Sequence, residues 1–175
     1  MFHKVTISGT SCSGKTTLFW DLYQKLHWPT FSASHFFRDY ARTHQVSLQK
    51  AEEQDDSLTK VIDYGMQQLL NKEQNVILEG WMAGIMADKI PDVLKVLLTC
   101  EDTVRAQRFA QREKMDVAAA QKQITEREQN VYGKLKEFYK RDDFLDPQNY
   151  DLVIDTSNKT PQEVLTLVLE KLGTS

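Results

Sequence analysis

The chain has 175 residues, which is enough for one compact domain with a hydrophobic core and too few for two domains of ordinary size. Its 22 Lys and Arg against 25 Asp and Glu give a net charge of -3, which excludes a general attraction to nucleic acid or to anionic membranes. The sequence contains neither a signal-peptide pattern nor an apolar run long enough to span a bilayer, so we expect a cytoplasmic protein and a monomer.

The first predicted elements are a strand, a glycine-rich loop and a helix. Residues 5–8 form a short run of β-forming residues that stops at a glycine, and apolar residues recur at helical spacing after Lys15. The loop between them has the pattern Gly-x-x-x-x-Gly-Lys-Thr and consists of Gly9, Thr10, Ser11, Cys12, Ser13, Gly14, Lys15 and Thr16.

This spacing is typical of a phosphate-binding loop, or P-loop. Glycines let backbone NH groups converge on a phosphate chain, and the helix that follows directs its positive end at the same anion. We therefore expect Lys15 to reach the β- and γ-phosphates of ATP and the Thr16 hydroxyl to bind Mg²⁺. Cys12 has two interpretations, a redox-active thiolate favoured by the helix terminus or a side chain that points away from the phosphates, and we favour the second.

The region after the first helix predicts one more strand and two helices. Residues 29–33 predict a short strand, and the aromatic residues that follow them suit a helix packed on a sheet. Residues 48–71 carry apolar side chains at helical intervals and predict a long amphipathic helix.

The second half of the chain predicts three more strands. Residues 75–80 and 93–99 are short apolar runs typical of buried strands, and residues 151–155 predict a last one. Between them, residues 102–141 predict two highly charged helices. The sequence Thr160-Pro161-Gln162-Glu163 is typical of a capping box that begins a final helix.

Five strands that alternate with helices predict an α/β fold with three layers, αβα, in which helices cover both faces of a five-stranded parallel sheet. A GTP-binding switch is disfavoured within this class, because no aspartate has a glycine three residues after it. The nearest approach to a guanine-reading Asn-Lys-x-Asp motif, at residues 158–161, ends in proline.

A pair of arginines favours a small-molecule kinase. Arg108 and Arg112 lie four residues apart on one face of the helix after the fourth strand. Fixed guanidinium groups suit the charge that develops on a transferred phosphoryl group, whereas the alternative is a solvated surface helix.

A set of motifs in chain order resembles one family over nearly the whole chain. The motifs are Lys15-Thr16-Thr17, Ser32-Ala33 with Arg38 downstream, Leu78-Glu79-Gly80 followed by Ala83-Gly84, the pair Arg108 and Arg112, Glu126-Arg127-Glu128, and residues 150–156. In these features the chain resembles the cytidylate kinases of the archaeal type, a branch of the nucleoside monophosphate kinases.

The resemblance implies an architecture and a reaction. It implies one P-loop kinase domain over residues 1–175, with strand order 2-3-1-4-5, an acceptor-binding helical region at about 33–71 and a helical lid at about 114–141. The implied reaction transfers a phosphoryl group from ATP to CMP or dCMP, with Mg²⁺ and without a covalent intermediate. The implied partners are therefore ATP and a nucleoside monophosphate, with no nucleic acid and no membrane.

The resemblance also assigns roles to single residues. Ser32 and Arg38 would lie in the acceptor monophosphate site, and Arg108 would lie against the ATP base. Lys15 and Arg112 would be catalytic, because both would grip phosphates during the transfer.

Further residues have supporting roles by the same resemblance. Thr17 would belong to the ATP-binding loop, and Glu79 would face the acceptor side and orient Mg²⁺-bound water, unless it is only a surface acid at a strand end. Arg127, Lys134 and Lys136 are candidate lid cations.

Two positions depart from the family pattern. Ser34 replaces the glycine of the usual Ser-Ala-Gly turn, and Trp81 replaces an arginine that helps to hold the acceptor phosphate. Trp81 would either stack on the acceptor base or pack against a helix. The alternatives to a cytidylate kinase are a P-loop kinase of another small acceptor and a nucleotide-binding module without turnover.

Overall fold

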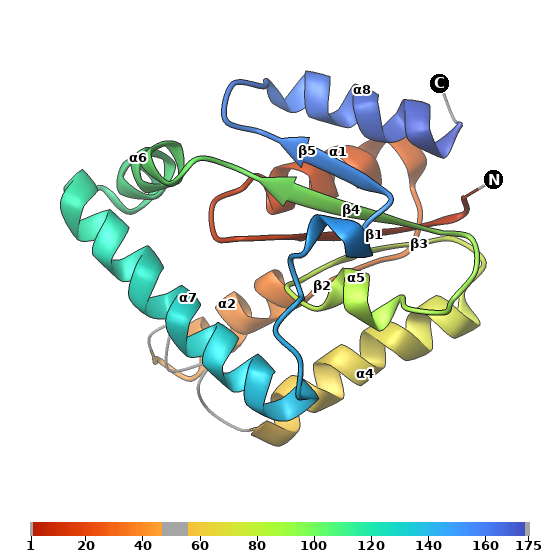
Figure 1. The fold of residues 1–175 in the computed structure, drawn as a ribbon, viewed down its shortest axis with the longest axis horizontal. Coiled ribbons are helices and arrows are strands. Elements are labelled where there is room, and N and C mark those ends of the chain that lie inside the picture. The colour runs from red at the N-terminus through yellow and green to blue at the C-terminus, as the bar shows by residue number, and fades with distance from the viewer. Residues whose placement is uncertain (1, 47–55, 174–175) are drawn as a thin grey trace.

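Five parallel strands form the centre of the computed structural model, which describes residues 2–46 and 56–173 (Figure 1). They lie in the order β2-β3-β1-β4-β5, and every pairing between neighbours is parallel. The strands are β1 (Lys4–Gly9), β2 (Thr30–Ser32), β3 (Val76–Glu79), β4 (Val93–Thr99) and β5 (Leu152–Asp155). This confirms the predicted α/β class and the order 2-3-1-4-5. The central strands β1, β3 and β4 are covered on both faces, so most of their residues are apolar, and Thr6 and Ser8 of β1 are buried as well.

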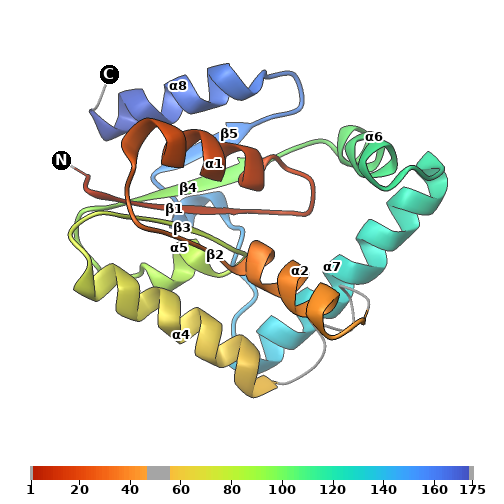
Figure 2. The same ribbon diagram turned by 180° about the vertical axis from the view of Figure 1, so that it is seen from behind.

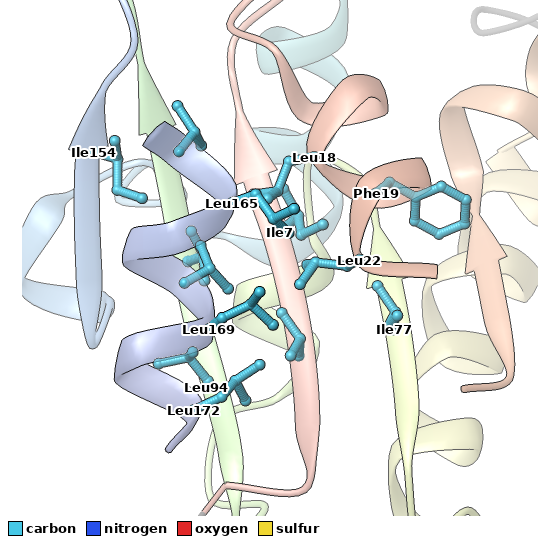
Figure 3. Close-up of a cluster of buried hydrophobic side chains, with 14 of the residues drawn as sticks. Ile7, Leu18, Phe19, Leu22, Ile77, Leu94, Ile154, Leu165, Leu169 and Leu172 are labelled. Atoms are coloured by element: carbon cyan, nitrogen blue, oxygen red, sulfur yellow. The ribbon is translucent and has the colours of Figure 1, made fainter. Parts of the chain in front are cut away.

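Two helices cover one face of the sheet, α1 (Lys15–Leu26) and α8 (Pro161–Leu172) (Figure 1). Their leucines point at the strands and form one buried cluster with them, as Figure 3 shows. The labelled members of this cluster are Ile7, Leu18, Phe19, Leu22, Ile77, Leu94, Ile154, Leu165, Leu169 and Leu172. The predicted capping box at the start of α8 is present, since Thr160 and Glu163 exchange hydrogen bonds between side chain and backbone.

The opposite face is covered by α4 (Asp56–Lys72) and the short α5 (Ala83–Met86), as the view from behind also shows (Figure 2). Helix α2 (Ala33–Thr43) follows the edge strand β2 directly, because the Ser32 side chain caps it by accepting a hydrogen bond from the His35 backbone. Of the helix predicted at residues 48–71, the part before residue 56 lies outside the described residues, and the rest is α4.

The charged region forms two helices, α6 (Asp102–Glu113) and α7 (Val117–Tyr139), which pack on each other. Asp116 separates them, because its carboxylate accepts hydrogen bonds from the first backbone NH groups of α7. Helix α7 crosses the molecule from α6 toward α4 (Figures 1 and 2). Its Leu135 lies in the buried cluster of the α4 face. A short 3₁₀ helix, η1 (Pro147–Asn149), then leads into β5. Within the described ranges, no helix has the length and apolar character needed to cross a bilayer.

Candidate active site

The P-loop joins β1 to α1, and its backbone requires glycine at both ends of the Gly-x-x-x-x-Gly pattern. Gly9 has a φ of 150°, and a Cβ atom built on it would lie 2.4 Å from the carbonyl oxygen of Leu98 in β4. Gly14 has a φ of 97° and forms the N-cap of α1. Both conformations are ones that side chains disfavour, and they bring the loop close to the end of the sheet.

Lys15 is held inside this loop and is only 7% exposed. Its Nζ donates a hydrogen bond of 2.8 Å to the carbonyl oxygen of Thr10 and lies 5.5 Å from the centre of the Trp81 ring. Burial lowers the pKa of Lys15, and the negative charge of Glu79 opposes that shift. A bound phosphate would therefore provide the opposite charge that this buried ammonium group needs.

A pocket of about 260 Å³ opens beside the loop and is lined by five cationic residues. They are Lys15, Arg38, Arg108, Arg112 and Arg127, and we call them the cation cluster. The pKa of Arg38 is lowered, first by burial and then by the positive charge of Arg112, which shows how close these groups lie. Like charges at this density repel one another, so the arrangement favours a polyanionic ligand.

The pocket brings together most of the residues predicted from the sequence. Ser11, Cys12, Thr16, Thr17 and Trp81 line it together with the cation cluster. The thiol of Cys12 is free, and its side chain also packs against the cluster between α6 and α7.

Ser32 and Glu79 do not line this pocket but lie behind it. Glu79 is fully buried and accepts hydrogen bonds from the hydroxyls of Ser32 and Ser34, the latter at 2.7 Å. The interpretation of Glu79 as a surface acid is therefore wrong. Ser34, which the sequence marks as a departure from the family pattern, lies in the pocket wall and supplies the second hydrogen bond.

Arg108 is fixed at the boundary between two pockets. Its guanidinium group donates to the carbonyl oxygens of Cys12 and Thr156, at 3.3 and 2.7 Å, and to the Thr156 hydroxyl at 3.1 Å. The second pocket, of about 230 Å³, has Gly14, Thr156, Lys159 and Pro161 in its wall. Sequence reasoning missed Thr156, Lys159 and Pro161, although residues 150–156 are part of the family resemblance.

Arg105 and Glu128 connect α7 to the P-loop, and the sequence did not single out either as a functional residue. The Glu128 carboxylate accepts a hydrogen bond of 2.9 Å from the Ser11 backbone NH and one of 2.5 Å from Arg105. Arg105 also donates to the Ser11 carbonyl and to Asp102. Burial lowers the pKa of Arg105, but these carboxylate hydrogen bonds outweigh it and leave the pKa raised. The middle of the predicted lid is thus attached to the P-loop through Glu128.

The three candidate lid cations have different surroundings. Arg127 lines the phosphate-loop pocket, whereas Lys134 lines a separate pocket beside α4. Lys136 is paired with Asp142 at 2.9 Å, and Lys60 of α4 lies over the Phe138 ring at 4.7 Å. Of the three candidate lid cations, Arg127 is the one that belongs to the cation cluster.

The donor groups in the pocket fit Mg²⁺ bound mainly through a nucleotide. Among the residues that the structure describes, no three acidic, histidine or cysteine side chains gather to form a metal site of their own. Thr16 lines the pocket next to Lys15, as the P-loop pattern requires. Mg²⁺ is commonly held by one or two protein oxygens, phosphate oxygens and water, so a single hydroxyl at this point is sufficient.

The fold and the loop define a small kinase of the P-loop class. The shikimate kinase from Acinetobacter baumannii in complex with shikimate has the same fold, with a TM-score of 0.63 over 99% of this chain and 94% of that one, at 15% identity. Residues 65–158 match the model of the cytidylate kinase-like family.

Curated relatives agree with that match. The cytidylate kinase of Sulfolobus acidocaldarius is 34% identical over 169 residues, which cover 95% of this chain and 92% of the relative. The cytidylate kinase of Haloarcula marismortui is 32% identical over 168 residues, covering 94% and 86%. The chain belongs to the cytidylate kinase family.

Proposed function

We propose that this protein is a nucleoside monophosphate kinase that transfers the γ-phosphoryl group of ATP to CMP or dCMP, giving ADP and CDP or dCDP. The observation that supports it most strongly is the cation cluster, in which P-loop, α2, α6 and α7 each contribute to one pocket. A kinase of this kind must hold two phosphate groups against each other, and five cations from four segments of the chain can bind both. Family membership supports CMP as the acceptor.

The two pockets that meet at Arg108 suggest where the donor lies. We assign the triphosphate of ATP to the P-loop residues from Gly9 to Thr17 and its base to the pocket beside Thr156 and Pro161. Arg108 would then lie against the base, while its bonds to the loop and to Thr156 hold it in place.

The acceptor lies on the other side of the cation cluster in this proposal. Arg38 and Arg127 would bind its monophosphate, and Trp81 would lie along its nucleoside. Ser32 and Glu79 act as positioning residues, because their hydrogen bonds fix the turn that presents Ser34 and Arg38 to the pocket.

Catalysis then needs little covalent chemistry from the protein. Lys15 and Arg112 would neutralise charge on the transferred group as it moves in line from donor to acceptor. The Thr16 hydroxyl would help to hold Mg²⁺, which would supply positive charge to neutralise part of the same negative charge. We also propose residues 1–175 as one kinase domain whose lid is residues 114–141. The two free cysteines agree with a reducing cytoplasmic setting, and we propose a monomer there.

The proposal is tested by ADP release, measured with ATP, Mg²⁺ and a panel of nucleoside monophosphates. We expect CMP and dCMP to give the highest kcat/KM, and no ADP release when the acceptor is left out. If no nucleoside monophosphate is phosphorylated but a non-nucleotide acceptor is, the protein is instead a P-loop kinase of another small acceptor. ATP binding without turnover of any acceptor would favour a nucleotide-binding module.

Trp81 provides a second prediction, because it borders both the cation cluster and the pocket beside α4. Its ring lies nearly perpendicular to the Tyr132 ring, with centroids 5.1 Å apart, so the side chain packs against α7. We expect Trp81→Ala to raise the KM for CMP by a factor equivalent to about 1 to 3 kcal/mol, the usual contribution of a base stacked on an aromatic ring. Trp81→Arg should lower that KM if an arginine here can reach the acceptor phosphate. The factor would be equivalent to about 1.5 to 3 kcal/mol at most, the contribution of one charge-assisted hydrogen bond.

The matched control is Trp20→Ala, since Trp20 is 41% exposed on α1 and does not line either pocket. The measurement is steady-state kinetics with CMP, UMP and AMP side by side. An unchanged KM for every acceptor in both Trp81 variants would show that Trp81 only packs against α7.

A further inference from the structure

The pocket beside α4 adjoins the phosphate-loop pocket and has a buried acid in its wall. The two pockets share Ser34 and Trp81 in their walls. Beyond these residues the second pocket is formed by Phe37 from α2, by Thr59 and Asp63 from α4, and by side chains of α7. Given the proposed function, an acceptor whose phosphate lies at Arg38 would extend its base into this second pocket.

Asp63 is the only carboxyl group among the described residues that line the second pocket, and it is only 5% exposed. Its Oδ2 accepts a hydrogen bond of 2.7 Å from the Tyr139 hydroxyl at the end of α7. Burial raises the pKa of Asp63 to about 7, although the bond from Tyr139 and the positive charge of Lys134 oppose that shift. A carboxyl group costs free energy in such a place, so its presence calls for a ligand or a structural role.

The pyrimidine bases differ at the edge that such an acid would meet. Cytosine presents an amino group that donates, next to a ring nitrogen that accepts, whereas uracil presents a carbonyl that accepts, next to an NH that donates. A carboxylate oxygen accepts from the cytosine amino group, which is a known pairing of acidic side chains with this base. The ionised carboxylate can only accept, so it would face the carbonyl oxygen of uracil without a hydrogen bond.

We propose that Asp63 selects cytosine over uracil in the acceptor, by accepting a hydrogen bond from the amino group of the base. This inference rests on the proposed function, because it places the acceptor base in the pocket that Trp81 separates from the cation cluster. Tyr139 acts as a positioning residue, since it binds Oδ2 and leaves Oδ1 to meet the base.

The size of the pocket has a consequence for the lid. The pocket encloses about 50 Å³, which is room for only one or two water molecules and is too small for a pyrimidine ring. Helix α7 supplies Val131, Lys134 and Leu135 to its wall, so these side chains must shift outward to admit a base. Adenine presents the same donor and acceptor pair as cytosine at this edge, and its larger ring system is what the narrow pocket would exclude.

The test is the ratio of kcat/KM for CMP to that for UMP in the wild type and in Asp63→Asn. An amide can both donate and accept, so it can pair with either pyrimidine. We expect the variant to lose at least about 10-fold of the preference for CMP, which is the scale of discrimination by one good base contact. Asp39→Asn is the matched control, since Asp39 is a half-exposed acid on α2 outside this pocket and should leave the ratio unchanged.

The outcomes separate this inference from the proposed function. If the wild type phosphorylates no nucleoside monophosphate, the proposed function fails first. If the wild type prefers CMP and Asp63→Asn keeps the same ratio of CMP to UMP, Asp63 does not select the base and the inference alone is overturned. A neutral amide removes a buried charge, so we expect Asp63→Asn to be at least as heat-stable as the wild type at pH 8. If it does not fold, Asp63→Ala is tested for the same loss of preference.

Discussion

Lys15→Ala is expected to reduce kcat/KM for CMP phosphorylation to below about one thousandth of the wild-type value. The reason is the position of its ammonium group, which lies inside the P-loop, 2.8 Å from the Thr10 carbonyl oxygen. Lys15 also lines the pocket of the cation cluster. No other group in the loop carries a positive charge. The variant should therefore lose the positive charge that stabilises the γ-phosphoryl group in the transition state of its transfer from ATP to the acceptor.

The fold should survive this substitution. Lys15 is buried, and burial lowers its pKa, so removing the ammonium group removes a charge that is costly in the protein without a ligand. Circular dichroism and thermal unfolding on the kinetic sample check this point. Lys25→Ala is the matched control, because Lys25 lies in the last turn of α1 and is exposed. Near-normal turnover by a folded Lys15→Ala variant would remove the P-loop from the mechanism.

The sequence predicted the sheet well because each strand has a local signature. The strands β1, β3 and β4 are covered on both faces, so apolar residues with high β propensity dominate them, and the strand order followed from the family resemblance. The P-loop was equally clear, because its chemistry needs glycine at two fixed positions with unusual φ angles. These features depend on residues close together in the chain.

The contacts that the sequence missed join residues far apart in the chain. Ser34 was interpreted as a departure, and only the pairing of β2 with β3 shows that its hydroxyl reaches Glu79. The buried pair of Arg105 and Glu128 is hidden in a highly charged segment where most side chains are solvated. Burial of Asp63 depends on the packing of α4 against α7, which no short pattern can reveal. Helical spacing predicts which face of each helix is apolar, but it does not predict the element against which that face packs.

Arg112 is the second residue whose removal should have a large effect on the reaction. It lines the same pocket as Lys15 and lies close enough to Arg38 to lower the pKa of that residue. Its side chain is still 45% exposed, and its guanidinium group pairs with Glu113 at 2.8 Å and lies over the Phe109 ring. A half-exposed cation of this kind contributes little to folding, and it can move onto a phosphoryl group during transfer.

We therefore expect Arg112→Ala to lower kcat by about 10²-fold or more while the Kd for ATP changes by no more than about 3-fold. A group engaged mainly in the transition state changes the rate much more than it changes ground-state binding. The measurements are steady-state kinetics with CMP and ATP titration calorimetry. Arg42→Ala serves as the control, because Arg42 is an exposed arginine paired with Asp39 on α2. If Arg112→Ala instead raises the KM for ATP at unchanged kcat, Arg112 binds the donor and does not act in catalysis.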